Sequence, residues 1–321
     1  MTICLINKGF KPMSQLSVFL GSLGLSMILA GVAGLGIASS AGMSLEEPQF
    51  MFQPKNAPTL QLIQAVSAFM IFGLPAILFA FVCYSNSWTA LGLGKPGRLS
   101  LAIISFILIL STVPLTDALG ILNKAIPLSP GLRAYFDQKE AAYEAQVKLM
   151  LELGNPVGLM KSLLLVAILP GIVEELFFRG ALQGMLHRWW GKPWVAIVVT
   201  SVIFSAIHFS WYGFIPRVML GMVLGTVFYI SGNLWLSILM HVVNNAIGVV
   251  YLFVQQQQGN GLDSIQTSFF PVWAGAFSVV AVVGLLAWMM KLSPPVAPKE
   301  VMYRRNYPFA PAEEKKPGDN P

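Results

Sequence analysis

Three ionisable side chains interrupt a long apolar stretch near the middle of the chain. Glu174, Glu175 and Arg179 lie within residues 158–181, where the only other charged residue is Lys161, near the start. A run of this length suits a membrane-spanning helix of roughly 20 residues. Ionisable groups inside a span are costly, and they usually face a bundle interior or a wet cavity. We therefore interpret this segment as a candidate functional site.

The spacing gives the two glutamates different partners. Glu175 and Arg179 are four residues apart, so they share a helix face and can form an intrahelical ion pair. Glu174 is rotated by about 100° from Glu175 and is left to face another group. We expect Glu174 to take part in chemistry, while Glu175 and Arg179 support the structure. A purely structural polar cluster that joins two helices is the alternative interpretation.

Two further polar sites interrupt apolar runs downstream. His208 follows an apolar run, and His241 and Asn245 share one helix face at a spacing of four residues. Asn244 lies on another face, so we expect it to bond a neighbouring helix. Three polar sites within about 70 residues of membrane sequence favour one functional cluster over independent packing residues.

Depth can be estimated by counting from the inner end of each expected helix at about 1.5 Å per residue. This count places Glu174 roughly 20 Å deep, His208 roughly 24 Å, His241 roughly 10 Å and Asn245 roughly 16 Å. All four depths fall within the hydrocarbon core. The spread of about 10 Å or more between Glu174 and His241 suits an extended peptide better than one metal ion.

These residues form three ordered motifs: E-E-x-x-x-R at Glu174, F-x-x-x-H ending at His208, and H-x-x-x-N from His241 to Asn245. The set resembles the CPBP family of intramembrane proteases, over about residues 158–248. That family includes type II CAAX prenyl endopeptidases and bacterial proteins linked to bacteriocin processing or self-immunity. The resemblance implies intramembrane cleavage of a peptide or protein substrate that is membrane-associated or lipidated.

The resemblance also implies a role for each motif residue. Glu174 and His208 would activate a water molecule, and His241 with Asn245 would hold the oxyanion. The family has also been described as metalloproteases, in which case Glu174, His208 and His241 would be the zinc ligands. Because the H-E-x-x-H spacing is absent, zinc stays open as a cofactor. The estimated spread of depths makes us prefer a metal-free mechanism.

Two alternative functions belong to other classes. A non-catalytic membrane binding or immunity protein could keep the same fold, although the intact motif residues weigh against it. A transporter would also place charges near the bilayer midplane, but it would typically show two related halves. The sequence contains no such repeat.

Composition sets the class of fold. The chain of 321 residues is 55% hydrophobic and only 11% charged, with a mean hydropathy of +0.69. These values predict an all-α polytopic transmembrane bundle that contacts membrane lipid. The two cysteines indicate neither a disulfide framework nor a thiolate metal site. No basic stripe with interleaved aromatics indicates a nucleic-acid partner.

About eight spans are expected. Their approximate ranges are 16–41, 60–84, 99–122, 158–187, 193–209, 214–230, 234–254 and 271–290. A proline near the middle of the second run, Pro75, predicts an interruption there. Residues 130–153 combine charges with apolar residues at helical spacing, which predicts an amphipathic helix that lies flat or folds over the bundle.

We divide the chain into four parts: N-terminal spans with the external amphipathic segment (1–157), the catalytic core (158–254), the last span (255–290) and a disordered tail (291–321). Basic residues mark alternate connections, which places both termini in the cytoplasm and, in a bacterium, the protein in the plasma membrane. These residues are Lys8, Lys11, Lys95, Arg98, Arg188, Lys192, Lys291, Arg304 and Arg305.

Overall fold

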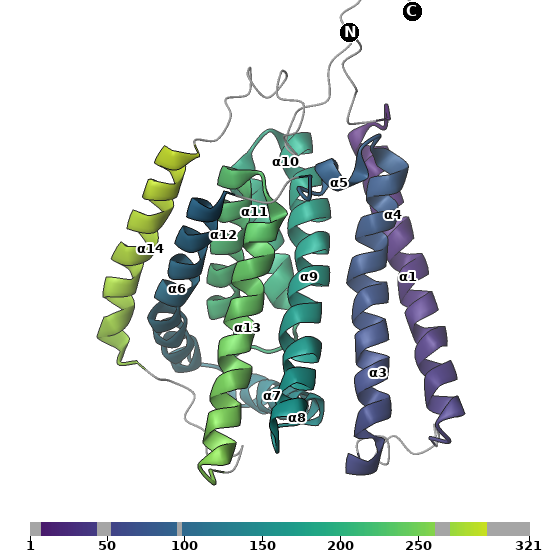
Figure 1. The fold of residues 1–321 in the computed structure, drawn as a ribbon, viewed down its shortest axis with the longest axis vertical. Coiled ribbons are helices and arrows are strands. Elements are labelled where there is room, and N and C mark those ends of the chain that lie inside the picture. The colour runs from purple at the N-terminus through teal and green to yellow at the C-terminus, as the bar shows by residue number, and fades with distance from the viewer. Residues whose placement is uncertain (1–7, 44–52, 95–97, 261–269, 294–321) are drawn as a thin grey trace, which may run out of the picture.

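The protein is an all-helical bundle that crosses a membrane several times (Figure 1). The computed structural model describes residues 8–43, 53–94, 98–260 and 270–293. Within these ranges there are helices and turns but no β-strand. Seven helices are long and apolar enough to cross a membrane, and an eighth, shorter apolar helix covers Pro193–Ala206. The all-α, multi-pass architecture of about eight spans is therefore confirmed.

The helices follow the predicted order closely. In the first half they are α1 (Pro12–Ser40), η1 (Pro54–Asn56), α3 (Ala57–Ala68), η2 (Phe69–Gly73), α4 (Leu74–Cys83), α5 (Ser87–Ala90), α6 (Leu99–Ala125) and α7 (Pro130–Met150). In the second half they are α8 (Pro156–Ser162), η3 (Leu163–Ile168), α9 (Leu169–Glu175), η4 (Leu176–Gln183), α10 (Gly184–Trp190), α11 (Pro193–Ala206), α12 (Phe214–Ser231), α13 (Leu234–Gln257) and α14 (Val272–Leu292). The predicted tail lies outside the described residues from position 294 onward, as do Lys95, Arg304 and Arg305.

Pro75 does not interrupt the second span, contrary to expectation. The chain stays helical from Ala57 to Cys83, and Pro75 falls in the first turn of α4, directly after the π-helical segment η2. The π-helical turn before Pro75, in which the N–H of Leu74 bonds to the carbonyl of Phe69, is a local departure from the regular α-helix at the place where the proline lacks an N–H.

The fourth span is the longest, running from Pro156 to Trp190. It contains two π-helical segments, η3 and η4, and η4 carries Arg179. Such segments are rare and occur often at functional sites, because the wider turn redirects side chains. Both segments lie on the helix that carries the two glutamates.

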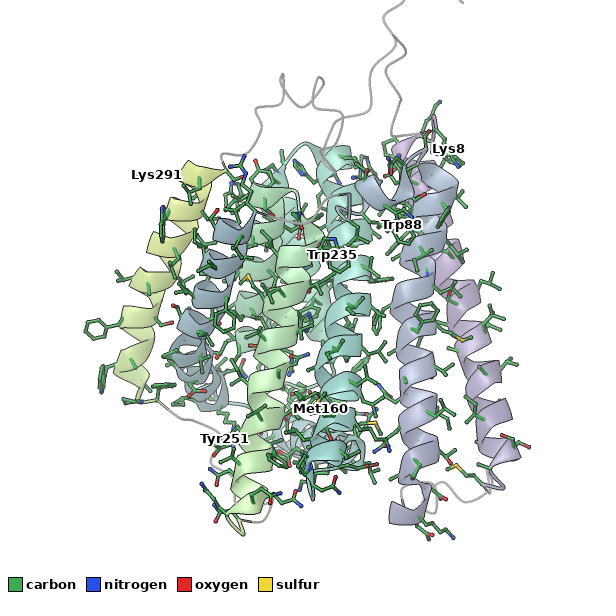
Figure 2. The ribbon with its side chains drawn as sticks, in the orientation of Figure 1. Lys8, Trp88, Met160, Trp235, Tyr251 and Lys291 are labelled. Atoms are coloured by element: carbon green, nitrogen blue, oxygen red, sulfur yellow. The ribbon has the colours of Figure 1, made fainter. Side chains whose placement is uncertain are left out.

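The described ends of the chain lie at the same end of the bundle. Lys8 and Lys291 are both near the top of Figure 2, whereas α7 and α8 lie toward the bottom of Figure 1. An even number of crossings has this result, as expected for eight spans. The bundle is tightened by short turns such as Gly232–Asn233, in which Gly232 has φ 62° and the Asn233 side chain accepts a hydrogen bond from Trp235 N.

The predicted amphipathic helix is α7, which begins after the N-cap residue Ser129. It runs across the bundle rather than along it (Figure 1). Its C-terminal part is tied to α3, where Gln61 donates to the carbonyl of Leu149 at 3.1 Å. Its middle part is tied to the turn between α11 and α12, where Ser210 donates to Glu140 at 2.7 Å. This helix therefore links the N-terminal spans to the region that carries His208.

Candidate active site

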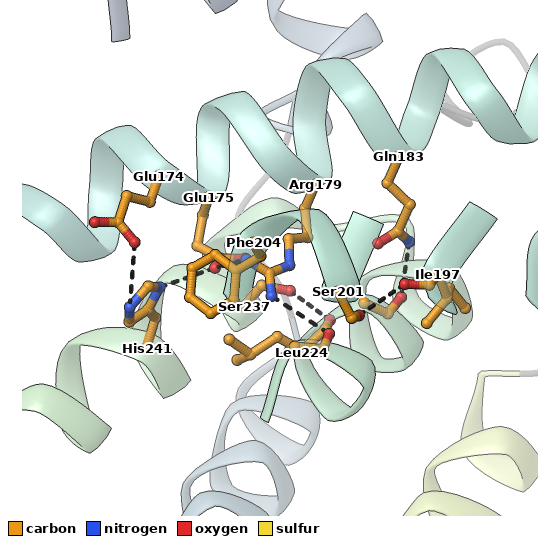
Figure 3. Close-up of polar contacts among 12 residues, drawn as sticks. Glu174, Glu175, Arg179, Gln183, Ile197, Ser201, Phe204, Leu224, Ser237 and His241 are labelled. Carbon is orange, nitrogen blue, oxygen red and sulfur yellow. Dashed lines mark hydrogen bonds and ion pairs between the residues drawn. The ribbon is translucent and has the colours of Figure 1, made fainter. Parts of the chain in front are cut away.

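The glutamate–arginine motif forms the predicted ion pair. Arg179 Nη1 lies 2.6 Å from Glu175 Oε1, and the two side chains are 1% and 0% exposed. Glu174 is turned away from this pair, and its side chain keeps 14% exposure. The sequence-based separation of the two glutamates is thus confirmed geometrically (Figure 3).

His241 lies between the two glutamates (Figure 3). Its Nδ1 is 2.9 Å from Glu175 Oε1, and its Nε2 is 3.9 Å from Glu174 Oε2. Because an ionised carboxylate can only accept, the Nδ1–H of His241 donates to Glu175. The four side chains therefore form a continuous row in the order Arg179, Glu175, His241 and Glu174.

The predicted depth difference between Glu174 and His241 is wrong, because α13 begins well below the end of α10. Leu234, the first residue of α13, donates its N–H to the carbonyl of Gly92 at 2.9 Å. A Cβ on Gly180 would lie 3.4 Å from the Leu234 side chain, so α13 starts level with Gly180. His241 comes seven residues after Leu234, and Glu174 six before Gly180, which brings the two to one level.

His208 lies just beyond a helix rather than inside one. The helix α11 ends at Ala206, three residues earlier than predicted, and His208 occupies the following turn. Its Nδ1 is 2.8 Å from the carbonyl oxygen of Phe204. A carbonyl can only accept, so Nδ1 carries the proton, and Nε2 of the neutral ring is an acceptor.

The phenyl ring of Phe204 contacts the imidazole rings of both histidines. Its centroid lies 5.1 Å from that of His208 and 5.7 Å from that of His241, with both pairs edge to face. The guanidinium of Arg179 lies 4.6 Å from the same ring. The buried phenyl ring thus joins the histidine turn to the row of charged residues.

Asn245 contacts the fourth span. Its Nδ2 donates to the carbonyl of Val166 at 3.3 Å, which leaves the second N–H of this amide for another acceptor. Asn244 donates to the side-chain oxygen of Asn245 at 3.2 Å. The expectation that Asn244 bonds a neighbouring helix is wrong: Asn245 makes that contact, because its amide faces the carbonyl of Val166 in η3.

The charged row continues into a polar contact between η4 and α12 that sequence reasoning missed. Arg179 donates to the carbonyl of Gly221 at 3.3 Å, and Gln183 donates to the carbonyl of Gly225 at 2.9 Å. A Cβ on Gly225 would lie 2.6 Å from Gln183 Oε1, so only glycine leaves room for this contact. The four-residue spacing of Glu175, Arg179 and Gln183, matched by two glycines four apart, is the signal that could have revealed it.

The proposed zinc ligands do not form a three-ligand set. Across the ranges that the structure describes, no group of three His, Cys, Asp or Glu side chains is close enough to hold a metal ion. Glu174 and His241 come within 3.9 Å, but His208 belongs to the separate contact with Phe204. A catalytic zinc site normally has three protein ligands and one water. The donor arrangement therefore does not fit such a site.

Fold and site together define an integral, multi-pass membrane protein whose helical bundle encloses a row of carboxylate, imidazole and guanidinium groups. Residues 156–247 match the family model described as type II CAAX prenyl endopeptidase Rce1-like. The match runs from α8 into α13, confirms the resemblance seen in the motifs, and supports a CAAX-type intramembrane endopeptidase in general terms. No curated protein and no solved structure matches the chain.

Proposed function

We propose that this protein is an intramembrane endopeptidase that hydrolyses a peptide bond with a water molecule activated by Glu174 and His208. The observation that carries the proposal is the partly exposed carboxylate of Glu174, which faces a histidine inside an apolar bundle within the Rce1-like region. The substrate is a membrane-associated or lipidated peptide or protein. A non-catalytic binding or immunity protein is the alternative.

Glu174 is the proposed general base. Its neighbour Glu175 is neutralised by Arg179, whereas the nearest basic group to Glu174 is the imidazole of His241 at 3.9 Å. His208 suits water activation for a separate reason: its Nδ1–H is engaged by the carbonyl of Phe204, so its Nε2 can accept a proton from water.

His241 and Asn245 are the proposed oxyanion donors. With His241 protonated, the row of two carboxylates, one guanidinium and one imidazolium has no net charge, and the Nε2–H of His241 is available on the side of Glu174. Asn245 offers the N–H that Val166 does not use. Fixed donors aimed at a developing oxyanion in a site of low dielectric are a large catalytic term.

We propose that the reaction needs no metal. The positions of the donors support this, because Glu174, His208 and His241 are not close enough together to bind one ion directly, whereas a water molecule can bridge side chains that are farther apart. Elemental analysis of active protein, together with chelator treatment and metal rescue, is the measurement. Stoichiometric zinc that is lost and restored with activity would reverse the proposal and make Glu174, His208 and His241 zinc ligands.

The test of the function uses purified protein in lipid nanodiscs and a fluorogenic farnesylated peptide that ends in Cys-aliphatic-aliphatic-Met. We expect the wild type to cleave it and Glu174→Gln to lose at least about 100-fold in kcat/KM, because removal of a general base typically costs 10²–10⁴-fold. Glu144→Gln, on the exposed side of α7, is the matched control and should retain activity.

Thermal unfolding of Glu174→Gln must match the wild type, since loss of activity through unfolding would carry no information about chemistry. A wild-type rate in Glu174→Gln would refute the assigned base. Absence of cleavage of this peptide and of its unprenylated counterpart by the wild type would favour the non-catalytic alternative.

A further inference from the structure

A second guanidinium lies beside the site and has no ion-pair partner among the described residues. Arg217, in the first turns of α12, is partly buried. Among the described residues it forms no ion pair, in contrast to Arg179, which is paired with Glu175. Its Nη2 donates to the carbonyl of Ser210 at 2.6 Å, and its Nε is buried with no hydrogen-bond partner. A buried cation in this state is costly unless a ligand completes it.

Arg217 lies at the side of the site that carries His208. It is close enough to His208 to interact with it electrostatically, and it interacts in the same way with Tyr143 of α7. Tyr143 in turn interacts with Glu174. Glu140 of α7 also interacts electrostatically with Arg217 but is not within ion-pair distance of it, and its carboxylate accepts a hydrogen bond from the Ser210 hydroxyl at 2.7 Å.

The turn from residue 207 to 213 holds the guanidinium in a fixed place. Asn123 of α6 clamps the turn by donating to the carbonyl of Trp211 at 2.8 Å and accepting from the N–H of Ile215 at 3.1 Å. The Trp211 ring stacks on Phe136 of α7, with centroids 5.0 Å apart. Contacts from two helices therefore fix this turn before any ligand binds, and preorganisation of this kind reduces the entropic cost of binding.

The absence of a side chain at Gly213 leaves space for the guanidinium of Arg217. A Cβ at this position would lie 2.3 Å from Arg217 Nη1 and 2.7 Å from Arg217 Cζ. The side chain is thus folded back over the backbone of the turn, and any larger residue at 213 would displace it. The Arg217 guanidinium is therefore held in one position over the turn and does not extend toward solvent.

We propose that Arg217 binds the free C-terminal α-carboxylate of the peptide substrate and so restricts cleavage to bonds a few residues from a C-terminus. This inference rests on the proposed peptidase function. A planar guanidinium matches a carboxylate with two parallel hydrogen bonds. Because Arg217 is partly buried between the turn and α7, a narrow peptide end is a better fit than a lipid headgroup.

Binding tests this proposal without requiring cleavage. In the Glu174→Gln protein, fluorescence anisotropy would compare a farnesylated peptide that ends in a carboxylate with the same peptide ending in an amide. We expect the acid to bind about 10- to 100-fold more tightly, the range for a partly desolvated charge pair. Adding Arg217→Gln should abolish this preference by weakening only the acid, and Arg217→Lys should restore part of it.

Gly213→Ala supplies an independent variant, because it moves the guanidinium but keeps its charge. We expect a reduced acid preference with little change in binding of the amide peptide. Equal affinity of acid and amide in the Arg217-containing protein would overturn the proposal, as would an equal loss for both peptides in Arg217→Gln. An amide peptide with an internal glutamate that binds as tightly as the acid would assign Arg217 to side-chain carboxylates instead and would also overturn it.

Cleavage by the otherwise wild-type protein separates this proposal from the proposed function. A preference for the acid in kcat/KM that disappears in Arg217→Gln, so that acid and amide are then cleaved with equal kcat/KM, supports both. Binding selectivity in a protein that cleaves neither peptide supports the carboxylate site and refutes the peptidase.

Discussion

Glu175 serves two partners in one buried row. Its Oε1 receives Arg179 Nη1 at 2.6 Å and His241 Nδ1 at 2.9 Å. A carboxylate that accepts from the far nitrogen of a histidine fixes the ring orientation and the tautomer, as second partners of catalytic histidines commonly do. The residue expected to be only structural is thus also a positioning residue for His241.

Single substitutions in this pair should destabilise the protein strongly. Arg179→Met leaves Glu175 without its guanidinium, and Glu175→Gln leaves Arg179 charged and buried, so each should cost about 3–5 kcal/mol. Thermal unfolding in nanodiscs is the measurement. A normal melting temperature for both variants would remove the pairing argument.

The double variant Glu175→Gln with Arg179→Met separates stability from positioning. Replacing a whole buried pair by groups of similar volume is often neutral, so much of the stability should return. Activity should stay low, because His241 no longer donates to a carboxylate. Recovery of stability and activity together would show that the orientation of His241 by Glu175 has no role.

At the scale of elements, the approach of α9 to α13 sets the distance between Glu174 and His241. A Cβ on Gly171 would lie 2.6 Å from Val242 Cγ2 and 3.1 Å from Val242 N, so the two helices touch at a glycine. Backbone atoms cannot yield as a flexible side chain would, and a larger residue must push the helices apart.

Gly171→Ala should therefore lower kcat/KM more than its effect on stability suggests. Overpacking of this kind costs about 1–3 kcal/mol, and widening the gap between Glu174 and His241 acts directly on the reacting groups. Gly248→Ala on the same α13 is the control, because nothing lies within 4 Å of the added Cβ. Equal activity of the two variants would contradict the proposed role of this helix contact.

The ion pair between Glu152, which precedes α8, and Lys161, which lies within α8, gives a prediction about pH. Lys161 Nζ lies 2.5 Å from Glu152 Oε1, and the hydrogen bond from Lys161 lowers the pKa of Glu152 from its usual value of 4.5. A lowered carboxyl pKa stabilises the fold above the unfolded-state value, and this contribution disappears as the pH falls through the folded-state value.

Glu152→Gln should accordingly lower the melting temperature slightly at pH 7 and have no such effect at a pH below the folded-state pKa of Glu152. The change is small because both side chains are partly exposed, at 42% and 40%, and water and salt screen the pair. Unfolding curves of both proteins at the two pH values are the measurement. A difference that persists in acid would show that the pair does not act through ionisation.

Sequence patterns located most element ends but not the relative heights of the elements. Apolar run lengths placed α6, α12 and α13 to within a few residues, because a membrane span must be about 20 residues long. Counting from helix ends failed for His241, since the start of α13 is fixed by the long-range hydrogen bond from Leu234 to Gly92. Tertiary contacts of this kind leave no periodic signal in the chain.

The candidate site shows the same difference between contacts within one helix, which spacing predicts, and contacts between helices, which it does not. Local spacing predicted the pair of Glu175 with Arg179, because i and i+4 positions meet in any helix. Spacing could not predict that His241 would contact both glutamates, or that Arg217 would lie beside His208, because these contacts join separate helices. The family resemblance predicted which residues belong to the candidate site, and the packing of the helices determines how these residues are arranged.

At the scale of the whole molecule, positive charge is sorted between the two ends of the bundle. Lys8, Lys291 and the turn between α10 and α11, which holds Lys192, lie at one end, and α7 lies toward the other (Figures 1 and 2). The acidic residues of α7 balance its basic ones, whereas the opposite end has a basic excess in short connections. The positive-inside rule then predicts that the end with Lys8 and Lys291 is cytoplasmic.

Labelling of single cysteines in intact cells tests this orientation. In a background with Cys4→Ser and Cys83→Ala, a membrane-impermeant maleimide should label Gln138→Cys on the exposed face of α7 from outside. Lys192→Cys should react only after the cells are permeabilised, because the end of the bundle that carries the termini faces the cytoplasm. The reverse pattern would invert the molecule and place the turn with His208 and Arg217 on the cytoplasmic side. A substrate with a free C-terminus would then have to reach the site from the cytoplasm.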